Sequence, residues 1–215
     1  MIDTLLEKNW IPDFLIRSQI RRLNQRRLKS EAQKHANGYK AELVKELKSL
    51  PIAIETIAAN DQHYEVPPEF FERCLGKHLK YSCCYWPNEV SNLDQAESSM
   101  LDLTCERAEL KDGQTILELG CGWGAISLWM AEHYPNSKIL SVSNSNDQRK
   151  FIEKTAAQRG LQNLQVQTCD MNSFETDQTF DRVVSVEMFE HMKNYDELLR
   201  RINKWLNSDG KLSVS

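Results

Sequence analysis

A glycine-rich turn between a predicted strand and a predicted helix constrains this chain more than any other feature. The segment Glu118–Gly124 reads ELGCGWG, follows the apolar stretch Thr115–Leu117 and precedes an amphipathic stretch that begins near Ala125. Glycines at alternate positions allow positive φ, and they let backbone N–H groups approach a ligand at the positive end of a helix. The pattern predicts a loop that binds a cofactor, although a plain strand-to-helix turn is the alternative.

The spacing of the glycines and the acid beside them indicate what kind of cofactor fits. The dinucleotide fingerprint G-x-G-x-x-G places its third glycine one position later than Gly124 lies in this chain. Glu118, two residues before Gly120, would repel a pyrophosphate but accept hydrogen bonds from an ammonium group. S-adenosylmethionine carries such a group in its amino-acid portion, so the loop favours this cofactor.

Strand-like and helix-like periodicities alternate along the second half of the chain. Strands are predicted at 114–119, 138–143, 164–169, 181–186 and 211–215, and helices at 125–133, 147–160 and 195–206. Such alternation is typical of an α/β fold, a mostly parallel sheet flanked by helices. The chain stops inside its fifth predicted strand, so we expect a sheet that is truncated at the C-terminus.

The residues before this region predict a separate organisation. Residues 1–90 are expected to form a helical N-terminal appendage and a segment that covers the cofactor, and residues 91–215 the cofactor-binding domain. Residues 1–60 predict two or three helices, residues 69–75 a short one, and residues 92–108 a longer helix with Asn92 as its N-cap.

Charge is divided unevenly along the chain. Residues 1–50 hold eleven Lys and Arg against six Asp and Glu, whereas the remainder holds sixteen against twenty-five. Arginines between 17 and 27 alternate with Ile16, Ile20 and Leu23 at helical spacing. This predicted helix either touches anionic lipid as a peripheral contact or packs against the rest of the fold or a second subunit in a homodimer. No nucleic-acid motif accompanies it, so no nucleic-acid partner is expected.

Composition favours a soluble cytoplasmic protein. The chain of 215 residues is 40% hydrophobic, but no apolar run approaches the ~20 residues that span a bilayer. Acids near Met1 argue against a signal peptide. The six cysteines show no C-x-x-C spacing, so we expect neither a metal site nor a disulfide framework.

Polar residues follow several predicted strands, where ligands collect in doubly wound sheets. Asn144 is placed to contact a ribose, with Gln148 nearby on the helix start. Asp170 can accept the exocyclic amine of adenine while Met171 lies on the ring. Capping a turn is the alternative role of Asp170.

The segment after the fourth predicted strand is the richest in ionisable groups. Glu187, Glu190 and His191 lie within five residues. If the segment is helical, their side chains project to one side, where they can share protons or hold a cation. Solvated charges at a helix start are the alternative.

Four motifs together resemble a known family. They are Gln62-His63-Tyr64 with Pro67 and Phe70-Phe71, then YSCCYW at 81–86, ELGCGWG at 118–124 and SVEMFEHM at 185–192. The chain resembles the S-adenosylmethionine-dependent enzymes that include cyclopropane-fatty-acid synthases and coclaurine N-methyltransferases. It is most similar to the coclaurine N-methyltransferase-like branch, through SNSNDQRKFIE at 143–153 and IPDFLI at 11–16.

The resemblance implies a Rossmann-like class I methyltransferase fold and a role for each candidate residue. Cofactor contacts are implied for Tyr81 and Ser82 (methionine portion), Gly120 and Gly122 (amino-acid end), Asn144 and Gln148 (ribose), and Asp170 and Met171 (adenine). Catalytic roles are implied for Glu187, Glu190 and His191.

Two features of the chain bear on the reaction that the resemblance implies. The lipid-modifying branch usually has a glycine at the position of Glu187, so methylation of a small amine is favoured over modification of unsaturated phospholipid. Relatives continue beyond the equivalent of residue 215, which leaves a truncated, non-catalytic cofactor-binding form as a further alternative.

Overall fold

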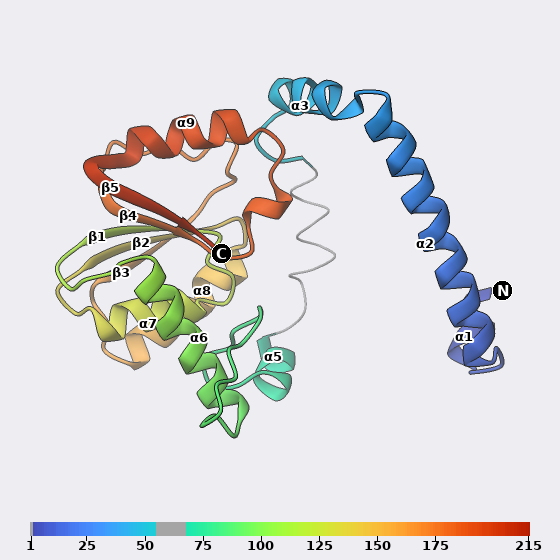
Figure 1. The fold of residues 1–215 in the computed structure, drawn as a ribbon. Coiled ribbons are helices and arrows are strands. Elements are labelled where there is room, and N and C mark those ends of the chain that lie inside the picture. Colours follow the sequence, from blue (N-terminus) through green and yellow to red (C-terminus); the bar gives the residue numbers. More distant parts are fainter. Residues whose placement is uncertain (1, 55–67) are drawn as a thin grey trace. The chain divides into compact units, whose positions relative to one another are not determined.

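The computed structural model describes residues 2–54 and 68–215 (Figure 1). The chain separates into two compact units, Met1–Ser49 and Leu50–Ser215. Residues 50–54 and 68–90, which were expected to belong with the N-terminal appendage, are therefore part of the unit that contains the sheet. Gln62, His63, Tyr64 and Pro67 lie outside the described residues.

The first unit consists of helices, as predicted. They are α1 (Ile2–Glu7), α2 (Asp13–Ala36) and α3 (Tyr39–Ser49). No residue of α2 is buried. Ile16, Ile20 and Leu23 follow one side of α2, but Phe14 and Leu15 project in other directions at 100° per residue. The helical spacing of Ile16, Ile20 and Leu23 is therefore confirmed, and exposed apolar residues of α2 also lie outside that side.

The second unit contains a parallel sheet of five strands, which confirms the predicted α/β class. The strands are β1 (Thr115–Leu119), β2 (Lys138–Ser143), β3 (Leu164–Thr168), β4 (Phe180–Ser185) and β5 (Leu206–Val214). Their order is β3-β2-β1-β4-β5, and every neighbouring pair runs parallel. The chain order reverses beside β1, which is where doubly wound sheets open a crevice at their carboxyl ends.

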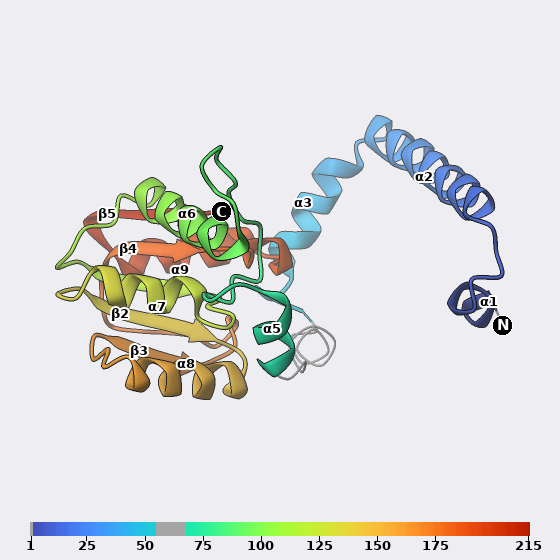
Figure 2. The ribbon, with the colours of Figure 1, turned by 90° about the horizontal axis from the view of Figure 1, so that it is seen from below.

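Helices cover both faces of this sheet (Figures 1 and 2). One face carries α9 (Tyr195–Trp205), and the other carries α6 (Leu93–Arg107), α7 (Ala125–His133) and α8 (Asn146–Gln158). A short helix, α5 (Pro68–Cys74), and a 3-10 turn, η1 (Phe189–His191), complete the unit. Asn92 caps α6 as predicted, because its side chain accepts the N–H of Gln95 at 3.0 Å.

The core follows the two-residue alternation of the central strand. Leu117 and Leu119 pack in the cluster that contains Ile202 and Trp205 of α9. Ile116, one residue out of phase, packs in the cluster that contains residues of α6 and α7. The strand is therefore apolar on both faces, as expected for a sheet covered on both sides.

The last strand differs from its prediction in where it begins. β5 starts at Leu206, which pairs with Phe180, and the next registered pair is Arg182 with Lys211. The residues between these pairs, 207–210, precede the strand predicted at 211–215 and form an irregularity within β5. Asn207 closes this irregularity, because its Nδ2 donates to Asp181 Oδ1 at 2.9 Å.

A short segment at the start of the second unit is fixed against the loops at the strand ends. Asn172 accepts the N–H of Ala53 at 3.0 Å and donates its own amide to Ala53 O at 2.9 Å. The N–H of Lys193 donates to Ile52 O at 2.7 Å. These bonds hold Ala53 and Ile54 beside the crevice.

We predict that Phe174→Ala destabilises the second unit by about 3–5 kcal/mol, the range for removing a buried aromatic ring. Phe174 is fully buried, and its ring meets that of Trp205 edge-to-face at 5.0 Å. The measurement is urea denaturation followed by tryptophan fluorescence. Leu199→Ala on the exposed side of α9 is the control and should change stability by less than about 0.5 kcal/mol; equal losses in both variants would contradict this core.

Candidate functional site

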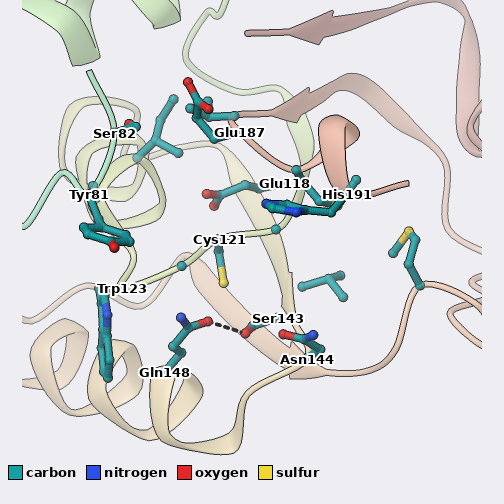
Figure 3. A pocket seen from close by; sticks show the side chains of 18 of the residues that line it. Tyr81, Ser82, Glu118, Cys121, Trp123, Ser143, Asn144, Gln148, Glu187 and His191 are labelled. Atoms are coloured by element: carbon teal, nitrogen blue, oxygen red, sulfur yellow. Dashed lines mark hydrogen bonds between the residues drawn. The ribbon is translucent and has the colours of Figure 1, made fainter. Parts of the chain in front are cut away.

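A cavity opens at the carboxyl ends of the strands and brings together most of the predicted site (Figure 3). Eleven of the twelve candidate residues line it: Tyr81, Ser82, Glu118, Gly120, Gly122, Asn144, Gln148, Asp170, Met171, Glu187 and His191. Glu190 is the exception. The cavity measures about 1340 Å³ including its open mouth. Its position at the carboxyl ends of the strands is where ligands bind in doubly wound sheets.

The glycine loop forms the floor of this cavity. Gly120 has φ 82°, and a Cβ there would lie 2.8 Å from Cβ of Met188. The N–H groups of Gly120 and Cys121 both donate to Val142 O, at 3.0 and 3.1 Å, so they stabilise the turn. Gly122 has φ 52°, and a Cβ there would meet nothing within 4 Å. The loop thus approaches a ligand most openly at Gly122.

Glu118 is a buried carboxylate at the end of the central strand, with 2% of its surface exposed. Its Oε2 accepts hydrogen bonds from Ser127 Oγ at 2.5 Å and Ser141 Oγ at 2.7 Å. Burial raises the pKa of this carboxyl from its usual 4.5 to about 7, even though both hydroxyl bonds act in the opposite direction. A cationic group entering the cavity would therefore stabilise the charged form.

Two buried donors at the cavity have no hydrogen-bond partner among the described residues. Ser143 Oγ donates to Gln148 Oε1 at 2.6 Å (Figure 3), which leaves Gln148 Nε2 unpaired. The indole Nε1 of Trp123 is likewise unpaired. Because buried polar groups are almost always satisfied, these donors indicate that a ligand with acceptor oxygens or nitrogens belongs here.

The predicted adenine site combines a structural role with a surface on the cavity. Asp170 Oδ1 accepts the N–H of Asn172 at 2.8 Å, so this carboxylate does cap a turn. Met171 is 7% exposed and packs in the core beneath the sheet edge while its remaining surface lines the cavity.

The acidic segment after β4 has a different backbone from the helix that we considered. The 3-10 turn includes only Phe189–His191, and Glu187 adopts a left-handed φ of 54°. Its N–H donates to Ser215 O at 2.9 Å. A side-chain hydrogen bond between Glu187 and Glu190, together with some burial and the negative charge of Glu190, raises the pKa of Glu187. Glu187 and His191 line the cavity, whereas Glu190 does not line it and contacts Glu187.

The segment Leu79–Ser82 contributes a residue that sequence reasoning missed. Lys80 lines the cavity with only 4% of its surface exposed, and its ammonium group donates to Ser82 Oγ. Burial lowers the pKa of this lysine. Nothing in the local sequence distinguishes Lys80 from an ordinary surface lysine. Tyr81, by contrast, is 57% exposed and packs its ring against Phe71 at 4.9 Å.

Glu97 of α6 fixes the backbone of this segment. Its fully buried carboxylate accepts the N–H groups of Gly76 at 2.8 Å, His78 at 2.9 Å and Lys80 at 3.3 Å. These three bonds lock the chain that carries Tyr81 and Ser82 to the cavity wall.

No cluster of three or more His, Cys, Asp or Glu with metal-binding geometry is present in the described ranges 2–54 and 68–215. None of the helices that the structure describes is long and apolar enough to cross a bilayer.

Comparisons with known proteins agree with this geometry. Residues 53–215 match the model of the mycolic acid cyclopropane synthetase family. An (S)-coclaurine N-methyltransferase from Thalictrum flavum subsp. glaucum is 43% identical over 97% of this chain and 59% of its own length. A coclaurine N-methyltransferase crystal structure with N-methylheliamine and SAH superposes with a TM-score of 0.86 at 40% identity, covering 98% of this chain and 62% of that one.

A lipid-modifying relative is also similar, at a lower level. A mycolic acid cyclopropane synthase solved with SAH and CTAB gives a TM-score of 0.67 at 28% identity, covering 74% of this chain and 56% of that one. The chain spans about three fifths of the first of these relatives.

We predict that Glu118→Gln stabilises the protein at alkaline pH and has little effect at pH 5. The pKa of Glu118 in the folded state is raised from 4.5 to about 7. Its favourable contribution to the free energy of unfolding is therefore complete below pH 4.5 and is lost as pH rises through 7. The neutral amide does not ionise, so above pH 8 the variant should be more stable to unfolding than the parent protein by up to about 3 kcal/mol. Urea denaturation between pH 5 and 9 measures the difference; a difference that does not change with pH would contradict the assigned pKa.

Proposed function

Because the chain belongs to the mycolic acid cyclopropane synthetase family, we propose that it binds S-adenosylmethionine and transfers a methyl group to the nitrogen of a small amine. The observation that carries this proposal is the buried Glu118 beneath a glycine loop, at a cavity that also holds unpaired donors. The relatives that cover most of the chain carry N-methyltransferase names.

The residues present fit each part of the cofactor. Glu118 accepts the ammonium group of the methionine portion, whose Cα lies against Gly120 and Gly122. Gln148 Nε2, which has no partner among the described residues, donates to a ribose oxygen, and Asn144 lies beside it at the end of β2. The fit follows from the chemistry of the donors and acceptors.

Three further residues complete the proposed cofactor site. Asp170 has a second carboxylate oxygen for the amine of adenine, and Met171 presents its thioether to the ring. Ser82 and Tyr81 close the site on the side of the methionine portion (Figure 3).

In this reaction the side chains of the protein remove a proton from the substrate amine. When bound, S-adenosylmethionine supplies an electrophilic methyl group on its sulfonium. An alkylamine with a pKa near 10.4 is neutral only about once in 10³ at pH 7. Glu187 holds the protonated amine at the cavity mouth, and His191 or Glu190 takes its proton. Positioning of the neutral amine supplies the rest of the acceleration.

The substrate class follows from the acidic side of the mouth and from the relatives. Glu187 and its neighbour Glu190 favour a cation over an apolar acyl chain. The similar crystal structure holds N-methylheliamine, and the similar enzyme is named for coclaurine. We infer that a small alkaloid-like amine is the substrate.

A second candidate is modification of an unsaturated phospholipid chain. The family name and the similar mycolic acid cyclopropane synthase favour it, as does the basic first unit. Co-sedimentation with anionic phosphatidylglycerol vesicles discriminates the two, because lipid activity requires salt-sensitive binding.

A third candidate is a form that binds the cofactor but does not turn over. Calorimetry that detects binding of S-adenosylhomocysteine, together with product assays that detect no methylated product, would identify this form.

Location and assembly complete the proposal. We infer a cytoplasmic protein with six free cysteines, and a homodimer or a peripheral membrane contact through the first unit. Trp10, Phe14 and Leu28 of that unit are 67%, 68% and 71% exposed, which favours a surface that is covered in some assembly. Sedimentation equilibrium with and without residues 1–49 tests this part.

The direct test of the reaction uses cofactor labelled in its methyl group. The protein is incubated with a panel of benzylisoquinoline amines and, separately, with unsaturated phospholipid vesicles. Labelled N-methyl product supports the proposal, labelled cyclopropane supports the second candidate, and the absence of both products supports the third.

We predict that replacing Glu190 and His191 together, by Gln and Ala, lowers kcat at least about 100-fold, because acid–base groups contribute 10²–10⁴. Affinity for S-adenosylhomocysteine should change less than about threefold, since neither side chain is assigned to the cofactor. Glu153→Gln, an exposed charge on α8, is the control and should match the parent protein. Undiminished turnover in the double variant would refute these roles.

A further inference from the structure

Lys80 is a buried cation that forms no ion pair with a carboxylate among the described residues. Its side chain lines the cavity with 4% exposure, and its ammonium group donates to Ser82 Oγ. Within residues 2–54 and 68–215, no carboxylate forms an ion pair with it within the 4.0 Å limit. Glu97, the nearest acid on α6, uses its carboxylate for the backbone N–H of Lys80 at 3.3 Å and for two other N–H groups.

Such an arrangement is unfavourable without a ligand. A buried ammonium group loses its hydration and needs an anion or several acceptors in return. Lys80 has one hydroxyl from Ser82, although an ammonium group can donate three bonds. Burial accordingly lowers the pKa of Lys80, and the nearby groups Cys83, Cys84, Glu187 and Glu97 offset this only in part.

Lys80 is the residue that brings an ammonium group to the cavity. Among the lining residues in the described ranges, Lys80 is the only lysine or arginine, whereas Glu118, Asp170 and Glu187 are acids. The ligand proposed above is a zwitterion at its amino-acid end, so it brings one cationic and one anionic group. Glu118 matches the first of these groups, and no residue assigned so far matches the second.

We propose that Lys80 is the counter-ion of the cofactor's carboxylate. This deepens the proposed function and rests on it. Lys80 and Ser82 lie on the segment that Glu97 fixes, so the positive group is held in place before the ligand arrives. With Glu118 at the ammonium and Lys80 at the carboxylate, the two opposite charges orient the amino-acid end in one direction only.

The first test varies the ligand and uses the unmodified protein. S-adenosylhomocysteine is compared by calorimetry with its decarboxylated analogue, which keeps the amine, thioether and nucleoside. We expect the analogue to bind about 10- to 100-fold more weakly, the value of a charge-assisted hydrogen bond in a partly desolvated site. Equal affinities would overturn the proposal, because the carboxylate would then have no counter-ion.

The second test removes the cation. Lys80→Met keeps an unbranched side chain of four atoms and removes the ammonium group. We expect it to weaken the binding of S-adenosylhomocysteine by the same factor, while the decarboxylated analogue binds as it does to the parent. Lys77→Met, an exposed lysine on the same segment, is the control and should preserve the discrimination. A Lys80→Met protein that still discriminates between the two ligands would overturn the proposal.

These outcomes separate this proposal from the proposed function. If S-adenosylhomocysteine does not bind the parent protein, the proposed function itself fails. If it binds but Lys80→Met lowers only kcat, Lys80 acts on Glu187 instead, and the counter-ion assignment is wrong. Should Lys80→Met fail to fold, as judged by circular dichroism, the comparison of ligands on the parent protein still decides.

Discussion

The constraint on which the site depends is the carboxylate of Glu118, which is buried in the central strand of the sheet, where it is not fully hydrated. Glu118 ends β1, the strand beside which the order reverses, and it is tied to α7 through Ser127 and to β2 through Ser141. Those hydroxyls orient the carboxylate but do not offset the loss of water, so its pKa is raised to about 7. The site is therefore organised to receive a positive group at one fixed point.

Other polar groups at the cavity also lack some of the partners that a buried polar group needs. Within the part of the chain that the structure describes, the side-chain oxygen of Gln148 has a hydrogen-bond partner but its nitrogen has none, and the indole N–H of Trp123 has none. Lys80 contacts a hydroxyl where a buried cation needs an anion. Each of these groups costs free energy in the isolated protein. Together these groups are complementary to a ligand that has acceptor atoms in its nucleoside and a zwitterion at its other end. Such complementarity before the ligand arrives is expected of a preorganised binding site.

The sequence predicted what local chemistry determines and missed what distant contacts determine. The glycine loop, the strand ends and the cap of α6 follow from spacing, because turns, alternation and caps are local. The burial of Lys80 depends on Glu97, which binds its segment from another helix. The left-handed Glu187 accompanies a bond to Ser215, and the early start of β5 follows from pairing with β4. No window of sequence contains those partners.

The central claim is that an S-adenosyl nucleoside occupies the cavity with its ammonium group on Glu118. Calorimetric titration of S-adenosylhomocysteine at pH 7, in buffers of different ionisation enthalpy, tests it most directly. The account predicts one saturable site with proton release, because pairing with a cation lowers the pKa of Glu118 from about 7, and it predicts no release in the Glu118→Gln protein. Absence of binding, or displacement of the ligand by NAD, would contradict the account.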